Sequence, residues 1–255
     1  MVFVDTEQKF SGARVAEIAA NAFPSAYGVS SEDTPTSTAA KAAALRSLTE
    51  KILVLTPSTL SETLQRLNGL EEALIDHAVR LLVVDSVAAL ARAEFGTGRG
   101  QIARRQELLG QIASVLKQQA ERLHMAALVT NQVTTRARSG ESAFAADDGA
   151  GSAATAAALG VKWAHCVNTR IVLEGATESS MMPAEGDGDR AGAKHPGARS
   201  RVVKVVKSPQ CALRGFEYQV WEGGVRVLGD RKVKVHPSGS AADGAIRHIF
   251  SGAAL

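Results

Sequence analysis

Three short runs of apolar residues, each followed at once by polar residues, constrain the fold of this chain more than any other feature. They are residues 2–5, 80–85 and 125–130. Segments with apolar residues at helical spacing separate them, such as residues 59–74. Fully apolar strands that alternate with amphipathic helices are typical of a parallel sheet. We therefore expect an α/β fold with a mostly parallel sheet that helices cover on both faces.

The helices between these runs carry recognisable start signals. Ser11 precedes apolar residues at helical spacing, and Thr59 with Glu62 three residues later forms a capping-box pattern. Residues 102–123 keep an apolar period of 3.6 residues, which predicts a long helix. After residue 167 the pattern changes to strands with short turns, and we expect these strands to extend the same sheet in antiparallel fashion.

Length and composition narrow the function classes. The chain has 255 residues, 45% of them hydrophobic, which suits one large α/β domain and excludes a wholly disordered chain. No apolar run approaches the 18 residues of a membrane span, and the chain does not start with a signal peptide, so we expect a soluble intracellular protein with no membrane partner. The two cysteines lack metal-ligand spacing, which argues against a zinc site.

Charge is distributed unevenly along the chain. The net charge is only +3, but residues 91–140 hold 8 bases and 3 acids, and residues 201–255 hold 9 bases and 4 acids. Each of these +5 blocks is either a site for a polyanion or a solvated charged face. Aromatic residues make up 4% of the chain, so contacts with nucleic acid would depend on cations more than on stacking.

Polar residues follow the ends of three successive predicted strands: Asp5-Thr6-Glu7, Asp85-Ser86 and Asn131-Gln132. In open α/β sheets, ligands bind beyond the carboxyl ends of parallel strands. An acid after four apolar strand residues has the form of a Walker B site, whose carboxylate holds the Mg²⁺ of a nucleotide directly or through water. Many apolar strands end in Asp for plain capping reasons, so the joint order of the three ends is what favours a nucleotide site.

Five segments carry motifs of one known family: residues 4–14, 82–90, 98–106, 130–133 and 158–170. They resemble the RecA/RadA-type DNA recombinases and, within them, the eukaryotic recombinase paralogues, most closely the B paralogue. In that family the first of these segments is the strand and helix that follow the phosphate loop. The second segment is the Walker B strand. The next two belong to the first and second DNA-binding loops. Trp163, His165 and residues 168–170 favour the B paralogue.

The resemblance implies nucleotide-handling roles for six residues. Glu7 and Gln132 are the implied catalytic residues: Glu7 positions the attacking water, and Gln132 couples the γ-phosphate to the second DNA loop. The implied cofactor-binding residues are Asp85, which holds Mg²⁺ through water, Ser86 in its support, His165 as a nucleotide sensor, and Lys207 facing a neighbouring protomer's ATP. The plain alternatives are a surface acid for Glu7, a helix cap for Asp85 and Ser86, strand-end hydrogen bonding for Gln132, a core histidine for His165 and a basic turn for Lys207.

The resemblance also implies a set of DNA-binding residues: Arg99 and Arg105 in the first loop, and Arg136, Arg138 and Phe144 in the second. Arginines pair with phosphates without reading sequence, and an aromatic ring stacks on any base. The alternative for each arginine is a solvated loop residue.

The phosphate loop of the family is missing from this sequence, which contains no Gly-Lys dipeptide. We expect a truncated gene model or isoform, because a sheet without its central phosphate-loop strand exposes two strand edges. The alternative is a product that has lost nucleotide hydrolysis. We expect residues 1–230 to form a RecA-like core, with a mobile DNA-binding loop at 136–158 and a disordered insertion at 175–200. Residues 231–255 would be a C-terminal tail.

These features lead to a functional expectation. The resemblance implies a nuclear protein of homologous-recombination repair that binds single-stranded DNA, joins other recombinase paralogues, above all the C member, and assists the main recombinase. ATP and Mg²⁺ are the implied cofactors, with DNA-dependent ATPase activity in a full-length form. The first alternative is a non-catalytic DNA-binding or assembly subunit that has lost ATP binding. The second is another RecA-core motor, which residues 158–170 argue against.

Overall fold

The computed structural model describes residues 1–96, 98–131, 133–135, 155–157, 159–175, 201–228 and 244–251. Its helices are α1 Gly12–Ala22, α2 Pro24–Tyr27, α3 Pro35–Glu50, α4 Leu60–Asn68, α5 Glu71–Asp76, α6 Val87–Glu94, α7 Arg99–Arg122 and α8 Gly160–Cys166. Its strands are β1 Val2–Asp5, β2 Leu53–Leu55, β3 Leu81–Asp85, β4 Ala126–Asn131, β5 Val133–Thr135, β6 Thr155–Ala157, β7 Thr169–Gly175, β8 Arg201–Lys207, β9 Arg214–Trp221, β10 Gly224–Val227 and β11 Gly244–Ser251.

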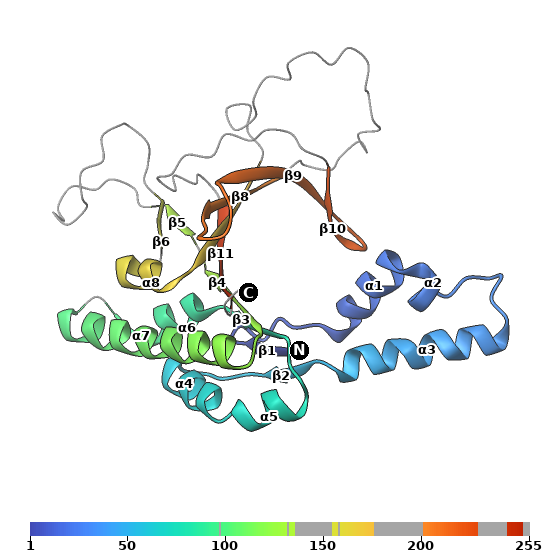
Figure 1. The fold of residues 1–255 in the computed structure, drawn as a ribbon, viewed down its shortest axis with the longest axis horizontal. Helices are drawn as coiled ribbons and strands as arrows, with labels where there is room; N and C mark the ends of the chain where they lie inside the picture. The colour runs from blue at the N-terminus through green and yellow to red at the C-terminus, as the bar shows by residue number, and fades with distance from the viewer. Residues whose placement is uncertain are drawn as a thin grey trace, which may run out of the picture.

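A nine-stranded sheet organises the chain in the order β10-β9-β8-β7-β11-β4-β3-β1-β2 (Figure 1). The strands β2, β1, β3 and β4 are parallel to one another, and β7 to β10 form an antiparallel meander. The predicted α/β fold, with a parallel sheet and an antiparallel extension, is therefore confirmed. A separate pair, β5 and β6, is antiparallel.

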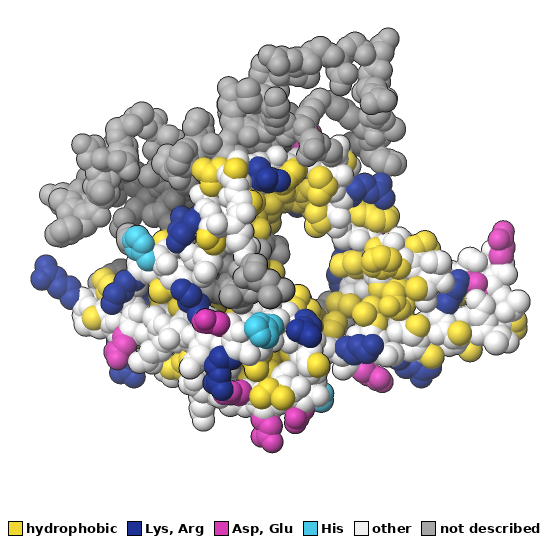
Figure 2. Space-filling model, in the orientation of Figure 1, with side chains coloured by type: hydrophobic (Ala, Val, Ile, Leu, Met, Phe, Trp, Pro, Cys, Tyr) yellow, Lys and Arg dark blue, Asp and Glu magenta, His cyan; other side chains and the backbone are white. Residues whose placement is uncertain are grey.

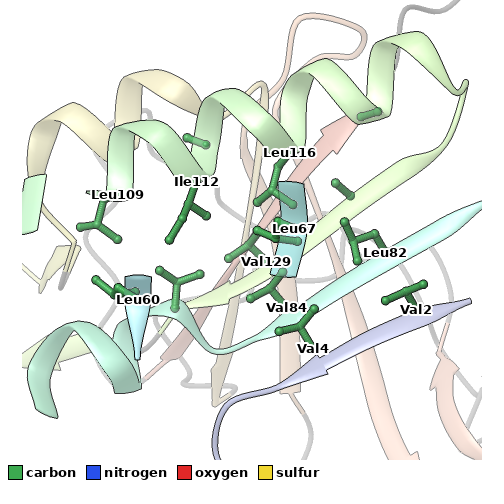
Figure 3. Packing of buried hydrophobic residues seen from close by; sticks show 14 of the residues in the cluster. Val2, Val4, Leu60, Leu67, Leu82, Val84, Leu109, Ile112, Leu116 and Val129 are labelled. Carbon is green, nitrogen blue, oxygen red and sulfur yellow. The ribbon is translucent and has the colours of Figure 1, made fainter. Parts of the chain in front are cut away.

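The hydrophobic core lies between the parallel strands and the helices α4 to α8. Val4, Val84 and Val129 point from neighbouring strands toward the helices, where Leu67 and Leu116 meet them (Figure 3). We call the side of the sheet that carries these valines the core face. The predicted leucine stripe of residues 59–74 is confirmed, because all its leucines are buried in this core or packed against it.

The predicted helix start signals are confirmed in detail. The Ser11 hydroxyl accepts a hydrogen bond from the Arg14 backbone N–H at 3.2 Å. Thr59 accepts from the Glu62 backbone N–H at 3.0 Å, while the Glu62 carboxylate accepts from the backbone N–H of Ser58 at 2.9 Å. The bond to Ser58 lowers the pKa of Glu62 below its usual value. Both caps satisfy backbone donors that a helix start leaves without partners.

Helices α1 to α3 form an arm beside the sheet (Figure 1). No residue of 12–50 belongs to the core cluster, so the helices of this arm do not take part in the core that the structure describes. The arm contacts the β9–β10 hairpin, where the Arg14 guanidinium donates to the Trp221 carbonyl at 3.2 Å. Hydrophobic side chains gather on the surface of α1 and α2 (Figure 2). Phe23, which lies between these two helices, is 62% exposed.

Part of the expected tail forms the strand β11 at the centre of the sheet. Residues 244–251 pair with β4 on one side and with β7 on the other, antiparallel to both. The edges of β4 and β7 that would otherwise be open are thus both paired, which gives the physical reason for this difference from the expected tail. Residues 136–154, 158 and 176–200, which hold most of the expected mobile loop and insertion, lie outside the described residues. Among the helices described, none is long and apolar enough to cross a membrane.

Candidate functional site

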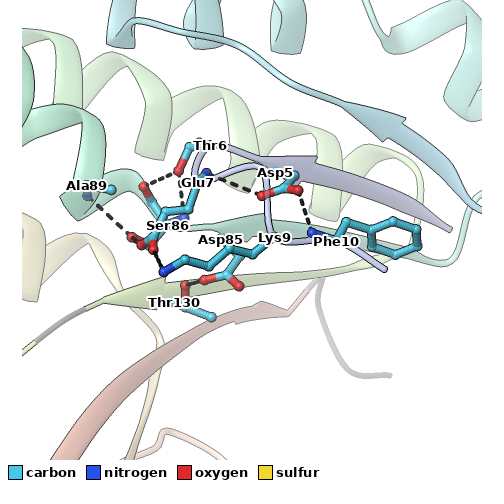
Figure 4. A network of polar contacts seen from close by, with 9 residues as sticks. All are labelled: Asp5, Thr6, Glu7, Lys9, Phe10, Asp85, Ser86, Ala89 and Thr130. Atoms are coloured by element: carbon cyan, nitrogen blue, oxygen red, sulfur yellow. Dashed lines mark hydrogen bonds and ion pairs between the residues drawn. The ribbon is translucent and has the colours of Figure 1, made fainter. Parts of the chain in front are cut away.

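The carboxyl ends of β1, β3 and β4 bring polar residues together, as predicted. Asp5 and Asp85 are register partners on neighbouring parallel strands. The Thr130 hydroxyl, near the end of β4, donates a hydrogen bond to the Asp85 carboxylate (Figure 4). Gln132, the third predicted strand-end residue with a catalytic role, lies outside the described residues.

Thr6, Glu7 and Ser86 connect the ends of β1 and β3. The Ser86 backbone N–H donates to the Thr6 hydroxyl, and the Thr6 hydroxyl donates to the Ser86 carbonyl, both at 2.8 Å. The Ser86 hydroxyl donates to Glu7 Oε1 at 3.1 Å, and Lys9 Nζ donates to Glu7 Oε2 at 2.5 Å (Figure 4). Glu7 and Ser86, which the sequence predicts to belong to one site, are therefore in direct contact.

The Ser86 hydroxyl takes part in two hydrogen bonds. Its hydroxyl oxygen also accepts from the Ala89 backbone N–H at 3.3 Å, so it caps α6 as well as contacting Glu7. The plain capping role is thus observed, and the same buried side chain contacts Glu7. The predicted role of Ser86 in cofactor binding stays a prediction. The peptide bond between Asp85 and Ser86 is cis.

Asp5 shapes the loop that carries Glu7. Its two carboxylate oxygens accept from the backbone N–H groups of Glu7 at 3.3 Å and Phe10 at 2.7 Å. Gln8, between these two residues, has a φ of 55°, in the left-handed region that non-glycine residues seldom adopt. Asp5 is buried and both of its carboxylate oxygens are engaged with this turn, so Asp5 holds the loop that carries Glu7 in place.

The charges at this edge are partly balanced by Lys9. Its hydrogen bond to Glu7, and then its attraction to that carboxylate, raise the pKa of Lys9 above its usual value. Lys9 is mostly exposed, so the ion pair contributes little to stability. Sequence reasoning gave no role to Lys9, Thr6 or Thr130. The signal for Thr130 was its place one residue before the named strand-end pair.

The residues at this edge suit Mg²⁺, which keeps several of its waters, but not a metal ion that is coordinated only by protein side chains. Asp85 offers a half-buried carboxylate, and of the side chains that the structure describes only Thr130 donates to it. Mg²⁺ typically uses one or two carboxylates and keeps several waters. The described residues hold no group of three or more His, Cys, Asp or Glu that could bind a metal, which a single-carboxylate Mg²⁺ site does not require. The same residues fit ATP less well than Mg²⁺, because the sequence has no Gly-Lys dipeptide with which to build a phosphate loop.

His165 and Lys207 lie at a second place, around the end of α8. Lys207 Nζ and Arg170 Nη2 both donate to the Ala164 carbonyl, at 3.2 and 3.4 Å, next in sequence to the exposed His165. Burial, and then repulsion from Arg170 and Lys117, lower the pKa of Lys207. Burial also lowers the pKa of Arg170. In the described part of the chain, no hydrogen bond or ion pair connects these residues to Glu7, Ser86 or Asp85.

Arg99 and Arg105 lie on a helix rather than on the DNA loop that the family resemblance implied. Helix α7 begins at Arg99, and the six-residue separation turns Arg105 about 120° away around the helix axis. Arg99 is exposed, whereas Arg105 is half-buried and its Nε has no partner among the described residues. Arg104, which sequence reasoning did not single out, lines a surface groove of about 550 Å³ on this helix. Arg136, Arg138 and Phe144 lie outside the described residues.

Comparisons with known proteins agree with this arrangement. A family model described as Rad51 matches residues 1–182. The chain is 32% identical over 252 residues to "DNA repair protein RAD51 homolog 2" of Mus musculus, an alignment that covers 91% of this chain and 61% of the mouse protein. The human protein of the same name is 32% identical over 237 residues, 88% of this chain and 53% of its own length. "DNA repair protein XRCC3 homolog" of Arabidopsis thaliana is 26% identical over 153 residues, 58% of this chain and 50% of its own length.

The chain thus spans between about half and three-fifths of the length of these relatives. The family match covers β1, β3 and β4, whose ends form the site, and it extends through α8. The predicted resemblance to recombinases is confirmed by both comparisons. This chain belongs to the Rad51 family of RecA-type recombinases.

Proposed function

We propose that this chain is the core of a recombinase paralogue that assists homologous-recombination repair of DNA breaks, by binding single-stranded DNA and supporting the main recombinase. The observation that carries the proposal is the contact between Glu7 and Ser86 beside Asp85, at the joined ends of β1 and β3 in a Rad51-family fold. The relatives named above are all called DNA repair proteins.

At the carboxyl edge, the proposed role of Asp85 is to hold Mg²⁺ through water. Bound Mg²⁺ would supply positive charge to the phosphates of ATP. Thr130 fixes the Asp85 carboxylate through its hydrogen bond. Ser86 and Lys9 hold the Glu7 carboxylate from two sides, which suits a group that orients a water molecule. Asp5 keeps the loop of Glu7 in place through two backbone contacts.

At the other sites, the proposed ligands are anions. Arg99 and Arg105, at the start of α7, would pair with DNA phosphates together with Arg136, Arg138 and Phe144, which lie outside the described residues. Lys207 and His165 would face the nucleotide of a neighbouring protomer. The proposed partners are single-stranded DNA, the C-type paralogue and the main recombinase, and the proposed location is the nucleus.

A second candidate function is a DNA-binding or assembly subunit that does not bind ATP. The sequence feature that favours it is the lack of any Gly-Lys dipeptide in the 255 residues. The DNA-dependent ATPase reading is therefore proposed for a form that includes a phosphate loop. Reading the gene in frame upstream of Met1 separates the two, because the second candidate predicts no G-x-x-x-x-G-K-S/T motif there.

The test of the DNA proposal is a fluorescence-anisotropy titration of a single-stranded oligonucleotide at several salt concentrations. Each phosphate contact on a single strand contributes about 0.7 to the slope of log affinity against log salt. We expect Arg99→Ala with Arg105→Ala to weaken binding and to lower the slope by about 1.4. Arg46→Ala, which removes an exposed arginine of α3, is the matched control and should change neither value. An unchanged slope in the double variant would refute the role of the two arginines.

A further inference from the structure

Two cations are direct partners on the neighbouring strands β7 and β8. The register of these antiparallel strands pairs Arg170 with Lys207. Both side chains reach the same atom, the carbonyl oxygen of Ala164 in α8, to which Lys207 Nζ donates at 3.2 Å and Arg170 Nη2 at 3.4 Å. Like charges that lie directly opposite on paired strands destabilise a sheet, and an anion beside them would remove that penalty.

A third cation, Lys117, approaches this pair from α7. Lys117 is exposed, and repulsion from Arg170 and from Lys117 adds to the larger effect of burial in lowering the pKa of Lys207. Among the residues that the structure describes, no carboxylate forms an ion pair with any of these three side chains. Three positive charges therefore lie close together, and no described acid balances them.

Capping of α8 accounts for only part of this cluster. The last carbonyls of a helix have no partner within it, and a cation near them is a common cap. The carboxyl end of a helix carries about half a negative charge, well below the three positive charges at this place. In addition, the Nε of Arg170 is buried and has no hydrogen-bond partner among the described residues. Because buried donors are nearly always paired, this N–H is a donor available to a ligand.

We propose that Lys207, Arg170 and Lys117 form a binding site for a phosphate group at the end of α8. A phosphate group carries up to about two negative charges and several acceptor oxygens, which arginine and lysine bind through charge-assisted hydrogen bonds. A ligand can reach the site, because Lys117 is exposed and the other two side chains are only partly buried. This inference rests on the proposed function, in which Lys207 faces a nucleotide, and it adds Arg170 and Lys117 as binding residues.

The test uses the full 255-residue chain, with tripolyphosphate as the probe and isothermal titration calorimetry at constant ionic strength. We expect Arg170→Gln and Lys207→Gln each to weaken binding about tenfold, because each removes a charge-assisted contact with phosphate. Lys117→Gln should weaken it about threefold, since an exposed charge acts through solvent. Arg46→Gln and Lys51→Gln, which remove exposed cations of α3 and its C-terminal cap, are the matched controls and should have no effect.

Two results would overturn the proposal: no binding of tripolyphosphate to the unchanged chain, or equal binding by the unchanged chain and the variants of the three cations. Arg170 and Lys207 also hold the Ala164 carbonyl, so thermal unfolding checks that their variants are folded. Lys117→Gln changes an exposed side chain of α7 and keeps the test decisive where the other two variants do not fold.

Competition identifies the source of the phosphate group and separates this proposal from the proposed function. Displacement of tripolyphosphate by an ATP analogue supports both the site and the nucleotide role of Lys207. Displacement by a single-stranded oligonucleotide alone supports the site and refutes that nucleotide role. Displacement by neither compound overturns the site. If the variants bind tripolyphosphate normally while the chain still binds single-stranded DNA, the site fails and the DNA proposal stands.

Discussion

The helices α4 and α3 show that length and a good cap do not anchor a helix to a fold. Helix α4 has nine residues and buries Leu60, Thr63 and Leu67. Helix α3 has 16 residues and buries none. Both begin with a threonine cap, Thr59 and Thr34. Most helical stability in proteins comes from packing of an apolar face, so α4 is part of the core and the arm of α1 to α3 is only attached to it.

The largest expected effect is a loss of stability on truncating a leucine side chain, which should be large in the core and small in the arm. Leu116 of α7 is fully buried, so Leu116→Ala should lower the free energy of unfolding by about 2–5 kcal/mol. The matched control is Leu45→Ala in α3, where the side chain is only partly buried and the cost should be well below that of Leu116. Urea unfolding followed by circular dichroism measures both. Equal losses would mean that the arm is as much a part of the core as α7.

A smaller effect compares the two threonine caps. Thr59 accepts from the Glu62 N–H at 3.0 Å, and Thr34 accepts from the Ser37 N–H at 3.2 Å. Loss of such a cap typically costs about 0.5–2 kcal/mol. We expect Thr59→Ala to lower the global stability by this amount, and Thr34→Ala to speed amide hydrogen exchange in α3 without changing the global value. A global loss from Thr34→Ala would contradict the division between arm and core.

The smallest effect is a pH dependence confined to the arm. The Lys41 side chain donates to Asp33, as do the Ser30 backbone N–H and the Ser37 hydroxyl, and together they lower the pKa of Asp33 from 3.8 to about 2. Because the folded pKa is the lower one, the charged Asp33 stabilises the start of α3 above the unfolded pKa. This contribution is lost as the pH falls from about 4 toward 2.

Hydrogen exchange in α3, corrected for its intrinsic pH dependence, measures this loss. We expect protection of α3 to fall across that pH window in the unchanged chain and to stay level in Asp33→Asn. A level profile in the unchanged chain would show that the contact with Lys41 does not stabilise the arm.

The sequence predicted the parts of the fold that depend on local signals. The leucine stripe of α4, the caps at Ser11 and Thr59, and the meeting of Asp5 with Asp85 all follow from periodicity or from parallel strand ends. The long helix predicted over residues 102–123 is confirmed as α7, although Ile102 is 38% exposed and burial along the helix starts only at Leu109.

The strand β11 depended on non-local pairing, which the sequence did not reveal. Residues 244–251 lack clean apolar alternation, and Arg247 with His248 in their middle favours a solvated segment. No local pattern shows that this segment returns from beyond β10, at one end of the sheet, to a place between β4 and β7. The hydrogen bond from Thr130 to Asp85 could not be predicted either, because it joins residues on two different strands and nothing in the sequence around Thr130 indicates its partner.

The central claim is that this Rad51-family chain binds single-stranded DNA through its phosphates. The most direct measurement is the affinity of the unchanged chain for single-stranded oligonucleotides of equal length and different base sequence, at low and physiological salt. We predict similar affinities for all sequences and a steep loss with added salt, because phosphate contacts do not read bases. Failure to bind any single strand at low salt would contradict the claim.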